Sequence, residues 1–575
     1  MNQTDELDLP EGQNPETVAE PLVEAEAVAE SATKQTSVAK SAGIVSIAVM
    51  FSRVLGLVRE QVFAFYFGAG FLYDAYQAAF TIPNVLRDLF AEGALSAAFV
   101  KVFTDYQIKK GEQEAWRLAS MVLNALAVVL SVFVLLGVLL TPYLVSIVAS
   151  GFSPEKAALT VTMTQIMFPF ILLVALAAVA MGVLNTKGVF GVPASASTVF
   201  NIVSIIFGLG FAYWLAGGTW QGSSDKSMIP SEGAQWAIIG MSIGTLIGGG
   251  AQFLMQVPSL RKVGFRFSPV LSFADEGVRR IMKLMAPAII GTSAVQINVL
   301  VNLAVVSSID GGRSWLSYAF RLMQFPIGVF GVAVGTASIP VLSRMASEGR
   351  LKDFRDTLSS SISLVFLMTV PSACGLIVLG EPIIRLIYER GRFHEADTAM
   401  TAYALAGYSI GLTGYAAIKV LSPAFYALDD AKTPMIIALG SIVVNAAASF
   451  LFREWLGAYG VGHVGVALAT SSVALVNFFA LALMMRRRIS RLNGRVIASA
   501  FLRIGLASAI MSVVCWFSFK LLHARFEGHG FLAKAIECFV PIGLGGLTFV
   551  IAAKILKIEE VEKIYNAIRR KLGAK

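Results

Sequence analysis

Long apolar stretches recur along this chain from Ile44 to Leu556. A helix of about 20 apolar residues crosses the roughly 30 Å hydrocarbon core of a bilayer. Inside that core only helices and closed barrels satisfy every backbone hydrogen bond, and a barrel would show short alternating segments, which this sequence lacks. The pattern therefore predicts an all-α polytopic membrane protein.

Composition supports this prediction. The chain has 575 residues, 56% hydrophobic and 14% charged, whereas soluble domains carry about 25% charged residues. We expect fourteen transmembrane helices, at 41–67, 74–106, 115–141, 157–186, 192–216, 234–257, 276–308, 313–346, 354–379, 397–427, 432–453, 461–485, 497–521 and 530–556.

The charged loops and termini predict the orientation. With the N-terminus inside, the inner loops hold most of the lysine and arginine, including the run Arg486–Arg488, so both termini are expected to be cytoplasmic. Residues 1–40 form an acidic segment that we expect to be disordered, and 557–575 a basic amphipathic tail. The net charge of +9 then reflects topology, and we expect no nucleic-acid partner.

The sequence repeats weakly at an offset of about 240 residues, with Pro142 matching Pro382 and Gly151 matching Gly391. Each half holds six predicted helices, an even number, so the repeat is parallel with a site expected between the halves. The predicted domains are the tail 1–40, an N-lobe 41–257, a C-lobe 258–487, two additional helices in 488–556 and the tail 557–575.

The first two predicted spans carry charges that a bilayer would bury. Such a charge costs roughly 2.5–3.5 kcal/mol at a helix centre, so it is kept where it forms an ion pair or lines a wet cavity. The cluster consists of Arg53, Arg59, Glu60, Asp74, Arg87, Asp88 and Glu92. It marks the predicted path of a polar group, although single members could instead be interfacial anchors or structural ion pairs.

The chemistry of the cluster favours a phosphate-bearing anion. Arginine stays charged, and its planar guanidinium binds phosphate through two parallel hydrogen bonds. By the repeat, Arg321 faces the first-half arginines, and the nearby carboxylates hold the arginines in place. A break at Gly56 would turn Arg53 and Arg59 toward one cavity, and Pro83 and Pro326 predict interrupted helices nearby.

The sequence shows no nucleotide-binding loop, nucleophile elbow or metal-ligand spacing. We therefore expect no catalytic residue, no metal and no cofactor. The four residues Glu389, His394, Glu395 and Asp397 are a faint candidate for a membrane enzyme acting on polyprenyl-phosphate lipids. The pattern of spans would also suit an oligosaccharide-lipid exporter, a drug exporter or a non-transporting scaffold. The intramembrane arginines argue against a drug–cation antiporter and against a scaffold.

Several segments resemble the MurJ/MviN family of lipid II flippases, within the multidrug/oligosaccharidyl-lipid/polysaccharide exporter superfamily. They are FSRVLGLVRE (51–60), FGAGFLYDAY (67–76), IPNVLRDLFAEGALSAAFV (82–100), WLSYAFRLMQFPIGVFGVAVGT (315–336) and VLSPAFYALDDAKTP (420–434). The resemblance implies alternating access by two six-helix lobes in the bacterial inner membrane, export of lipid II for cell-wall synthesis, and a groove at the last two helices for the lipid tail. We expect a monomer.

The resemblance also implies which residues line the central cavity. Arg59, Arg87 and Arg321 would bind the diphosphate; the other cavity residues would be Arg53, Ser52, Asp74, Asn84, Glu92 and Ser314. Two features depart from the family. The helix-eight arginine lacks flanking acidic residues, so Arg321 must be paired from elsewhere. Only Asn298, Asn302 and Asn445 stand where some members bind sodium with carboxylates.

Overall fold

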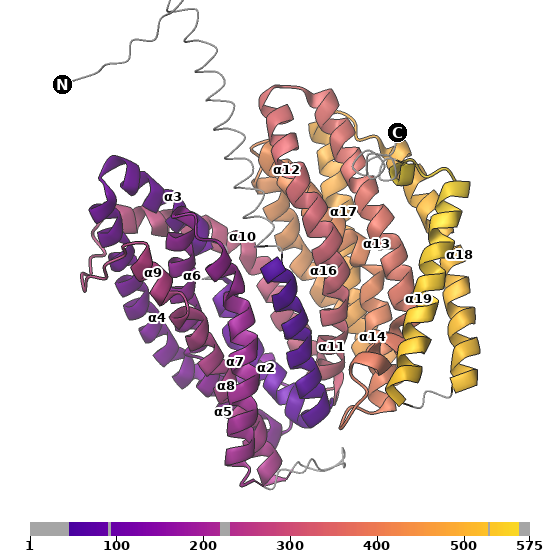
Figure 1. Cartoon of the computed structure of the whole chain (residues 1–575), viewed down its shortest axis with the longest axis horizontal. Helices are drawn as coiled ribbons and strands as arrows, with labels where there is room; N and C mark the ends of the chain where they lie inside the picture. The colour runs from indigo at the N-terminus through magenta and orange to yellow at the C-terminus, as the bar shows by residue number, and fades with distance from the viewer. Residues whose placement is uncertain (1–44, 46, 90–93, 219–230, 527–529, 563–575) are drawn as a thin grey trace, which may run out of the picture.

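The computed structural model describes residues 45, 47–89, 94–218, 231–526 and 530–562, and within them the chain is helical and forms no strand (Figure 1). A first helix over 47–67 precedes the labelled elements. These are α2 (Phe71–Arg87), α3 (Ala94–Lys109), α4 (Glu112–Val148), α5 (Pro154–Met167), α6 (Phe170–Thr186), α7 (Gly191–Leu215), α8 (Glu232–Leu254), α9 (Val257–Lys262), α10 (Glu276–Val306), α11 (Gly312–Pro326), η2 (Ile327–Gly331), α12 (Val332–Ser347), α13 (Leu351–Ile387), α14 (Glu395–Ile410), α15 (Leu412–Ala427), α16 (Lys432–Gly457), α17 (Gly462–Arg488), α18 (Gly494–Phe526) and α19 (Gly530–Ile555).

Eleven helical segments of the described chain are long and apolar enough to cross a membrane. They coincide with eleven of the predicted spans, which confirms the all-α membrane class. The number fourteen itself is not confirmed. The predicted spans 41–67 and 74–106 include positions outside the described residues, and 276–308 contributes a shorter apolar segment, Thr292–Val306.

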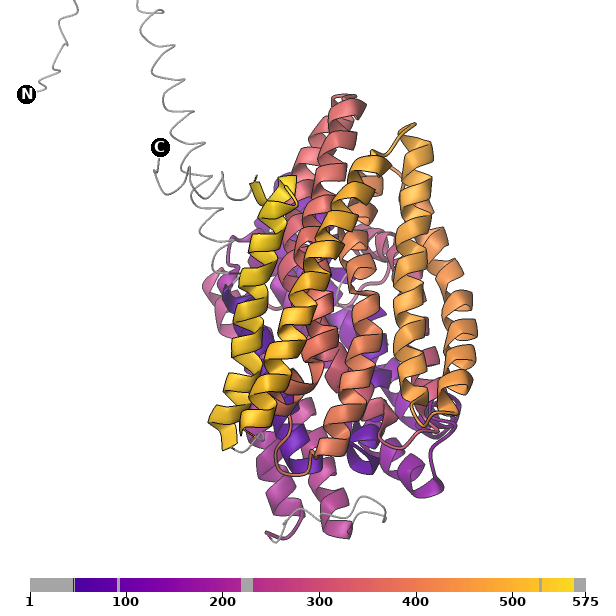
Figure 2. The ribbon, with the colours of Figure 1, turned by 90° about the vertical axis from the view of Figure 1, so that its right-hand side faces the viewer.

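The helices form two groups that lean together at one end of the molecule (Figure 1). We call the described residues 47–262 the first half and 276–488 the second half. Helix α10 packs against α3 and α4 of the first half and against α16 and α17 of the second. Helices α18 and α19 lie side by side along the second half, where both contact α13 (Figure 2).

The interruption predicted at Pro326 is confirmed, whereas the one predicted at Pro83 is wrong, because α2 continues through Pro83 to Arg87. Helix α11 ends at Pro326, and the next turn, Ile327–Gly331, is a π-helix, since proline has no N–H for the regular ladder. The predicted break at Gly56 is wrong: the first helix is continuous over 47–67. A Cβ on Gly56 would lie 3.8 Å from the side-chain amide of Asn201, so this glycine lies at a helix contact instead.

Two turns, one from each half, close the end at which the halves meet. In the first half, Gly151 N donates to Ser307 Oγ at 3.0 Å. In the second half, Arg392 N donates to Phe65 O at 3.0 Å, and a Cβ on Gly391 would overlap Phe65. Gly151 and Gly391 are equivalent in the sequence repeat, so each half docks the same turn onto the other, as a parallel repeat predicts. We call this end, with the turns 149–153, 307–311 and 388–394, the closed end.

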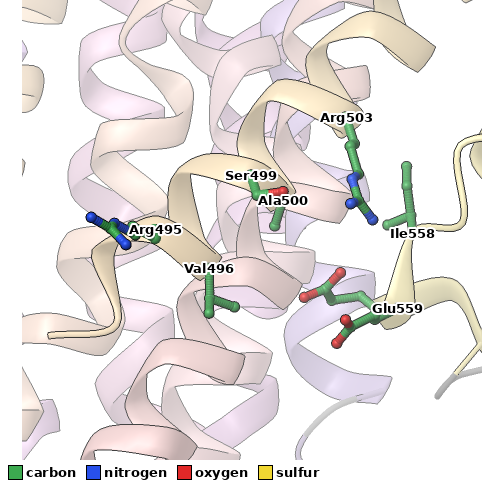
Figure 3. A pocket seen from close by; sticks show the side chains of 8 residues that line it. Arg495, Val496, Ser499, Ala500, Arg503, Ile558 and Glu559 are labelled. Atoms are coloured by element: carbon green, nitrogen blue, oxygen red, sulfur yellow. The ribbon is translucent and has the colours of Figure 1, made fainter.

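Helices α18 and α19 hold a small cavity at the end away from the closed end. Arg503 of α18 donates from Nη1 to the carbonyl of Lys557 at 3.1 Å. A cavity of about 230 Å³ lies beside this contact, lined by Arg495, Arg503 and Glu559 among others (Figure 3). The contact fixes the chain after α19 against the start of α18. Most of the predicted basic tail, and all of the acidic segment 1–40, lie outside the described residues.

Candidate functional site

The carboxylate of Glu60 joins arginines from both halves. Its Oε1 accepts from Arg321 Nη2 at 2.9 Å and lies 3.8 Å from Arg59 Nη2. Glu60 is 2% exposed and the Arg321 side chain 36% exposed, so the pair joins a buried carboxylate to a partly exposed guanidinium. The two residues are about 260 positions apart in the chain. The prediction that Arg321 faces a first-half arginine is confirmed here, and Glu60 supplies the pairing that the sequence around Arg321 lacks.

Two α2 residues that sequence reasoning missed hold Glu60 in place. Tyr73 donates its hydroxyl hydrogen to Glu60 Oε2, and the side-chain amide of Gln77 donates to the Tyr73 hydroxyl oxygen. The ring of Tyr73 stacks on Tyr318 of α11 at 4.8 Å, and Tyr318 donates to Gly68 O at 3.0 Å. The sequence offered one signal for these two residues. Tyr73 lies next to Asp74 and four residues before Gln77, so Tyr73 and Gln77 share one face of the helix.

Arg59 is buried yet has unused hydrogen-bonding capacity. Its guanidinium lies 5.2 Å from the ring centre of Phe200 and 5.9 Å from that of Phe80. Its Nε and Nη1 have no hydrogen-bond partner among the described residues. Buried donors are normally paired. The two unpaired N–H groups of Arg59 could therefore donate hydrogen bonds to an incoming anion.

Arg53 reaches across to the second half from the same continuous helix. Its Nη1 donates to Gln324 O of α11 at 3.3 Å, and a methyl group on Gly328 of η2 would overlap its guanidinium. Arg53 and Arg59 are six residues apart, about 120° on a straight helix. The two arginines consequently leave the helix in different directions without a break at Gly56, Arg53 toward η2 and Arg59 toward α2 and α7.

Arg87 lies in a separate set of contacts. Its Nη2 pairs with Asp88 Oδ1 at 2.6 Å, and Asp88 Oδ2 accepts from Gln296 of α10 at 3.3 Å. The prediction that a carboxylate holds Arg87 is confirmed for Asp88. Ser52 and Asn84 are half-buried. Glu92, the remaining predicted carboxylate, lies outside the described residues.

Asp74 does not hold an arginine, which corrects the expectation from sequence. It is fully buried and accepts from Lys156 Nζ at 2.9 Å and Gly311 N at 2.8 Å through Oδ2. Its Oδ1 accepts from Ser314 N at 2.8 Å and Ser314 Oγ at 2.6 Å. The carboxylate therefore caps the N-terminus of α11, where the helix dipole favours a negative charge.

This Asp74 contact ties the halves together at the closed end. Lys156 is 2% exposed and also pairs with Asp310, at 3.1 Å, on the 307–311 turn. A cavity of about 600 Å³ lies beside these residues, lined by both halves. Asp74 and Ser314 are equivalent in the repeat, and they bond to each other because the parallel repeat brings the starts of α2 and α11 together. Lys156 was missed by sequence reasoning, since its partner carboxylates lie in distant segments.

The three asparagines that the sequence offers in place of sodium-binding carboxylates form a neutral hydrogen-bond network. Asn302 Nδ2 donates to Thr470 Oγ1 at 3.0 Å, and Asn445 Nδ2 donates to Asn302 Oδ1 at 2.9 Å. Asn298 Nδ2 donates to Ser441 Oγ at 3.3 Å. These amides pack α10 against α16 and α17 without a formal charge.

Comparison with known proteins defines the family. The family model described as lipid II flippase MurJ matches residues 63–536. The chain belongs to the MurJ family. A curated relative from Burkholderia cenocepacia, named lipid II flippase MurJ, is 35% identical over 76% of this chain and 82% of its own length. A probable lipid II flippase MurJ from Vibrio cholerae is 32% identical over 90% of this chain and 96% of its own length.

Solved structures agree with the assignment. A lipid II flippase MurJ in an inward closed conformation superposes with a TM-score of 0.70, with 29% identity over 89% of this chain and 98% of that one. An inward-facing multidrug transporter of the MATE family shares the fold, with a TM-score of 0.62 and 15% identity over 78% of this chain and 96% of that one. This chain is thus a multi-pass membrane transporter of the MurJ family, and not an enzyme.

The faint enzyme candidate has a structural explanation in this MurJ-family chain. His394 N donates to Asp397 Oδ2 at 3.0 Å, which closes a capping box at the start of α14. Asp397 Oδ1 accepts from Trp315 Nε1 at 3.1 Å. Glu389 pairs with Lys534 at 3.1 Å. The side chains of Asp397 and Glu389 therefore serve helix capping and helix packing.

Proposed function

We propose that this protein moves lipid II from the inner to the outer leaflet of the bacterial cytoplasmic membrane by alternating access, for cell-wall synthesis. The observation that carries the proposal is the shared oxygen of Glu60. Guanidinium groups of opposite halves lie within 4 Å of one carboxylate oxygen, Arg59 at 3.8 Å and Arg321 at 2.9 Å. That spacing suits an anion with several oxygens, such as a diphosphate.

In the proposed mechanism Glu60 is a resident anion that the diphosphate displaces. Phosphate oxygens satisfy the open donors Nε and Nη1 of Arg59 and take Nη2 of Arg321 from Glu60. Glu60 then keeps the hydroxyl of Tyr73. Arg53 and Arg87, with Ser52 and Asn84, extend the binding surface along the same two helices. Displacement loosens the contact between the first helix and α11, and so favours separation of the halves.

We assign Asp74 and Ser314 to closure and not to the first contact with substrate. Their polar groups bond to each other across the halves at the closed end. Separation of the halves there would expose both side chains to the passing headgroup. From the positive-inside pattern of the loops we infer that the closed end is the outer one and that both termini are cytoplasmic. The substrate then enters from the cytoplasmic side.

The proposed mechanism also assigns roles to the two lobes and to the two additional helices. The lobes 41–257 and 258–487 rock against each other, and 488–556 provides the groove for the polyprenyl tail. One chain supplies arginines from both halves, so we propose a monomer as the working unit. A diphosphate with two negative charges gains about 5 kcal/mol per 100 mV on moving outward through an interior-negative membrane. The potential therefore favours export without a coupled cation.

Depletion of the protein, followed by measurement of the leaflet that holds lipid II, tests the proposal. We expect lipid II to accumulate in the inner leaflet, and Arg87→Ala and Arg321→Ala to fail to restore export. Arg117→Ala is the matched control, because Arg117 is exposed and pairs with Glu114 on the surface of α4. Normal export by both Arg87→Ala and Arg321→Ala would refute the assignment of the diphosphate site.

A further inference from the structure

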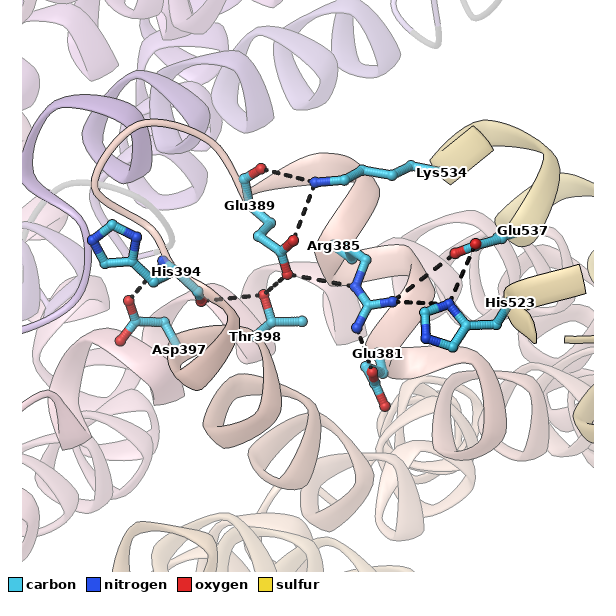
Figure 4. Close-up of polar contacts among 9 residues, drawn as sticks. All are labelled: Glu381, Arg385, Glu389, His394, Asp397, Thr398, His523, Lys534 and Glu537. Atoms are coloured by element: carbon cyan, nitrogen blue, oxygen red, sulfur yellow. Dashed lines mark hydrogen bonds and ion pairs between the residues drawn. The ribbon is translucent and has the colours of Figure 1, made fainter. Parts of the chain in front are cut away.

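The carboxylate of Glu389, at the closed end, connects two helices of the second half, α13 and α14, to α19 of the additional pair. Glu389 Oε1 lies 3.1 Å from Lys534 Nζ of α19. Glu389 Oε2 accepts from Thr398 Oγ1 of α14 at 2.7 Å and lies 3.5 Å from Arg385 Nε of α13 (Figure 4). Glu389 and Lys534 are 18% and 20% exposed, so water screens the pair only partly.

Arg385 makes a second connection to the same helix pair. It is 8% exposed and lies between Glu381, at 2.8 Å, and Glu537 of α19, at 3.9 Å. His523 of α18 lies 3.3 Å from both Arg385 Nη1 and Glu537 Oε1 (Figure 4). The guanidinium of Arg390 stacks over the ring of Phe531 at 5.1 Å. The end of α13 and the residues after it are thus held by α18 and α19 through charged contacts.

The turn anchored in this way is one of the two that close the molecule. Directly after Glu389, Gly391 and Arg392 pack against Phe65 and Gly68 of the first half. Just before it, Ile387 O accepts from Gln61 Nε2 of the first helix at 3.1 Å. Gly391 has φ 60°, which favours glycine, and a Cβ there would overlap Phe65. This close approach leaves little tolerance for movement of the turn.

The equivalent turn of the first half has no such anchor among the described residues. At the repeat offset, Glu389 corresponds to Ala149 and Arg385 to Val145, both buried apolar residues. The described first half also has no counterpart of α18 and α19. The charged residues therefore occur in the half that carries the additional helix pair, and the helix pair is what they contact.

We propose that Glu389 is a positioning residue that couples α18 and α19 to closure between the halves. Displacement of the pair pulls on Glu389 through Lys534 and shifts the 388–394 turn away from Phe65. The closed end then opens more readily, while the 149–153 turn is unaffected until the halves part. One part of this inference rests on the proposed function: the displacement of α18 and α19 is caused by a polyprenyl tail that enters beside them.

Spin-label distances across the closed end test the coupling without substrate. Labels on cysteines at Ala158 and Tyr459, both exposed positions of opposite halves, report the separation, with Cys374, Cys515 and Cys538 replaced by alanine. We expect Lys534→Met to raise the population with long distances about threefold, as loss of a partly exposed ion pair implies. Glu389→Gln is expected to act in the same direction.

Two variants separate coupling from a general effect of lost charge. Lys534→Arg keeps the ion pair and is expected to restore the native distribution. Lys520→Met removes a lysine of α18 that lies over Trp516, and is expected to leave the distribution unchanged. An unchanged distribution in both Lys534→Met and Glu389→Gln would overturn the coupling. The lipid II leaflet measurement with the Arg321 variant decides the proposed function independently, because the distances are recorded without lipid II.

Discussion

Replacing Asp74 by asparagine is expected to open the closed end of the protein. Asp74 accepts three hydrogen bonds from the second half, from Gly311 N, Ser314 N and Ser314 Oγ, all within 2.8 Å. A hydrogen bond to a charged group contributes about 1.5–3 kcal/mol and a neutral one about 0.5–1.5 kcal/mol. Asparagine keeps one acceptor oxygen and turns an amide toward at least one donor, so the loss is about 3 kcal/mol.

Because these three bonds form only when the halves meet, the loss falls on the equilibrium between closed and open arrangements. About 3 kcal/mol corresponds to a shift of roughly 100-fold toward the open arrangement. Ser314→Ala removes a single one of the three bonds and should shift the equilibrium roughly 10-fold. Asp310→Asn removes a contact of a 94% exposed carboxylate to Lys156 and should shift it about twofold at most.

Distance measurements between labels at Ala158 and Tyr459 give the populations directly. Labelling of a cysteine at Ala69, a buried residue beside the cavity at the closed end, gives an independent measure of access. The expected order of opening is Asp74→Asn, then Ser314→Ala, then Asp310→Asn. If Asp310→Asn opened the protein as much as Asp74→Asn, the capping of α11 by Asp74 would not be what holds the halves together.

Three further predictions concern other parts of the structure. Glu60→Gln should lower the stability of the apo protein by about 2 kcal/mol, since the buried Arg59 and the partly exposed Arg321 lose their counter-ion. The same change should tighten binding of a lipid II analogue, and weaker binding in titrations would contradict displacement of Glu60. Gly328→Ala should move the Arg53 guanidinium and weaken binding of the same analogue with little change in melting temperature, and an unchanged affinity would count against a role for Arg53. Asp430, in the turn before α16, accepts from Thr433 N and Thr433 Oγ1, and these bonds lower the pKa of its carboxyl. Its stabilising effect is therefore present above the ordinary carboxyl pKa and lost as pH falls through the lowered value. The difference in melting temperature between the native protein and Asp430→Asn should accordingly shrink as the pH is lowered below the ordinary carboxyl pKa; a constant difference would contradict the ionised cap.

Several properties followed from the sequence because they depend on local composition. Apolar length and backbone hydrogen bonding require helices in a bilayer, whatever their packing. The cost of burying charge singled out Arg53, Arg59, Glu60 and Arg87 as residues that needed partners. The repeat placed Arg321 opposite the first-half arginines, since equivalent positions of a parallel repeat meet around one axis.

The partners themselves depend on segments far apart in the chain. Glu60 and Arg321, like Asp74 and Ser314, meet only when the halves close, and no local pattern states which carboxylate takes which cation. The sequence suggested arginine partners for Asp74, whereas packing buried it against Lys156 and the start of α11. It also suggested a break at Gly56, whereas neighbouring helices accommodate a continuous one. Local hydrophobicity sets which segments are helices in the membrane. Which buried charges neutralise each other is set by the geometry of the closed halves, because an ion pair requires contact within about 4 Å.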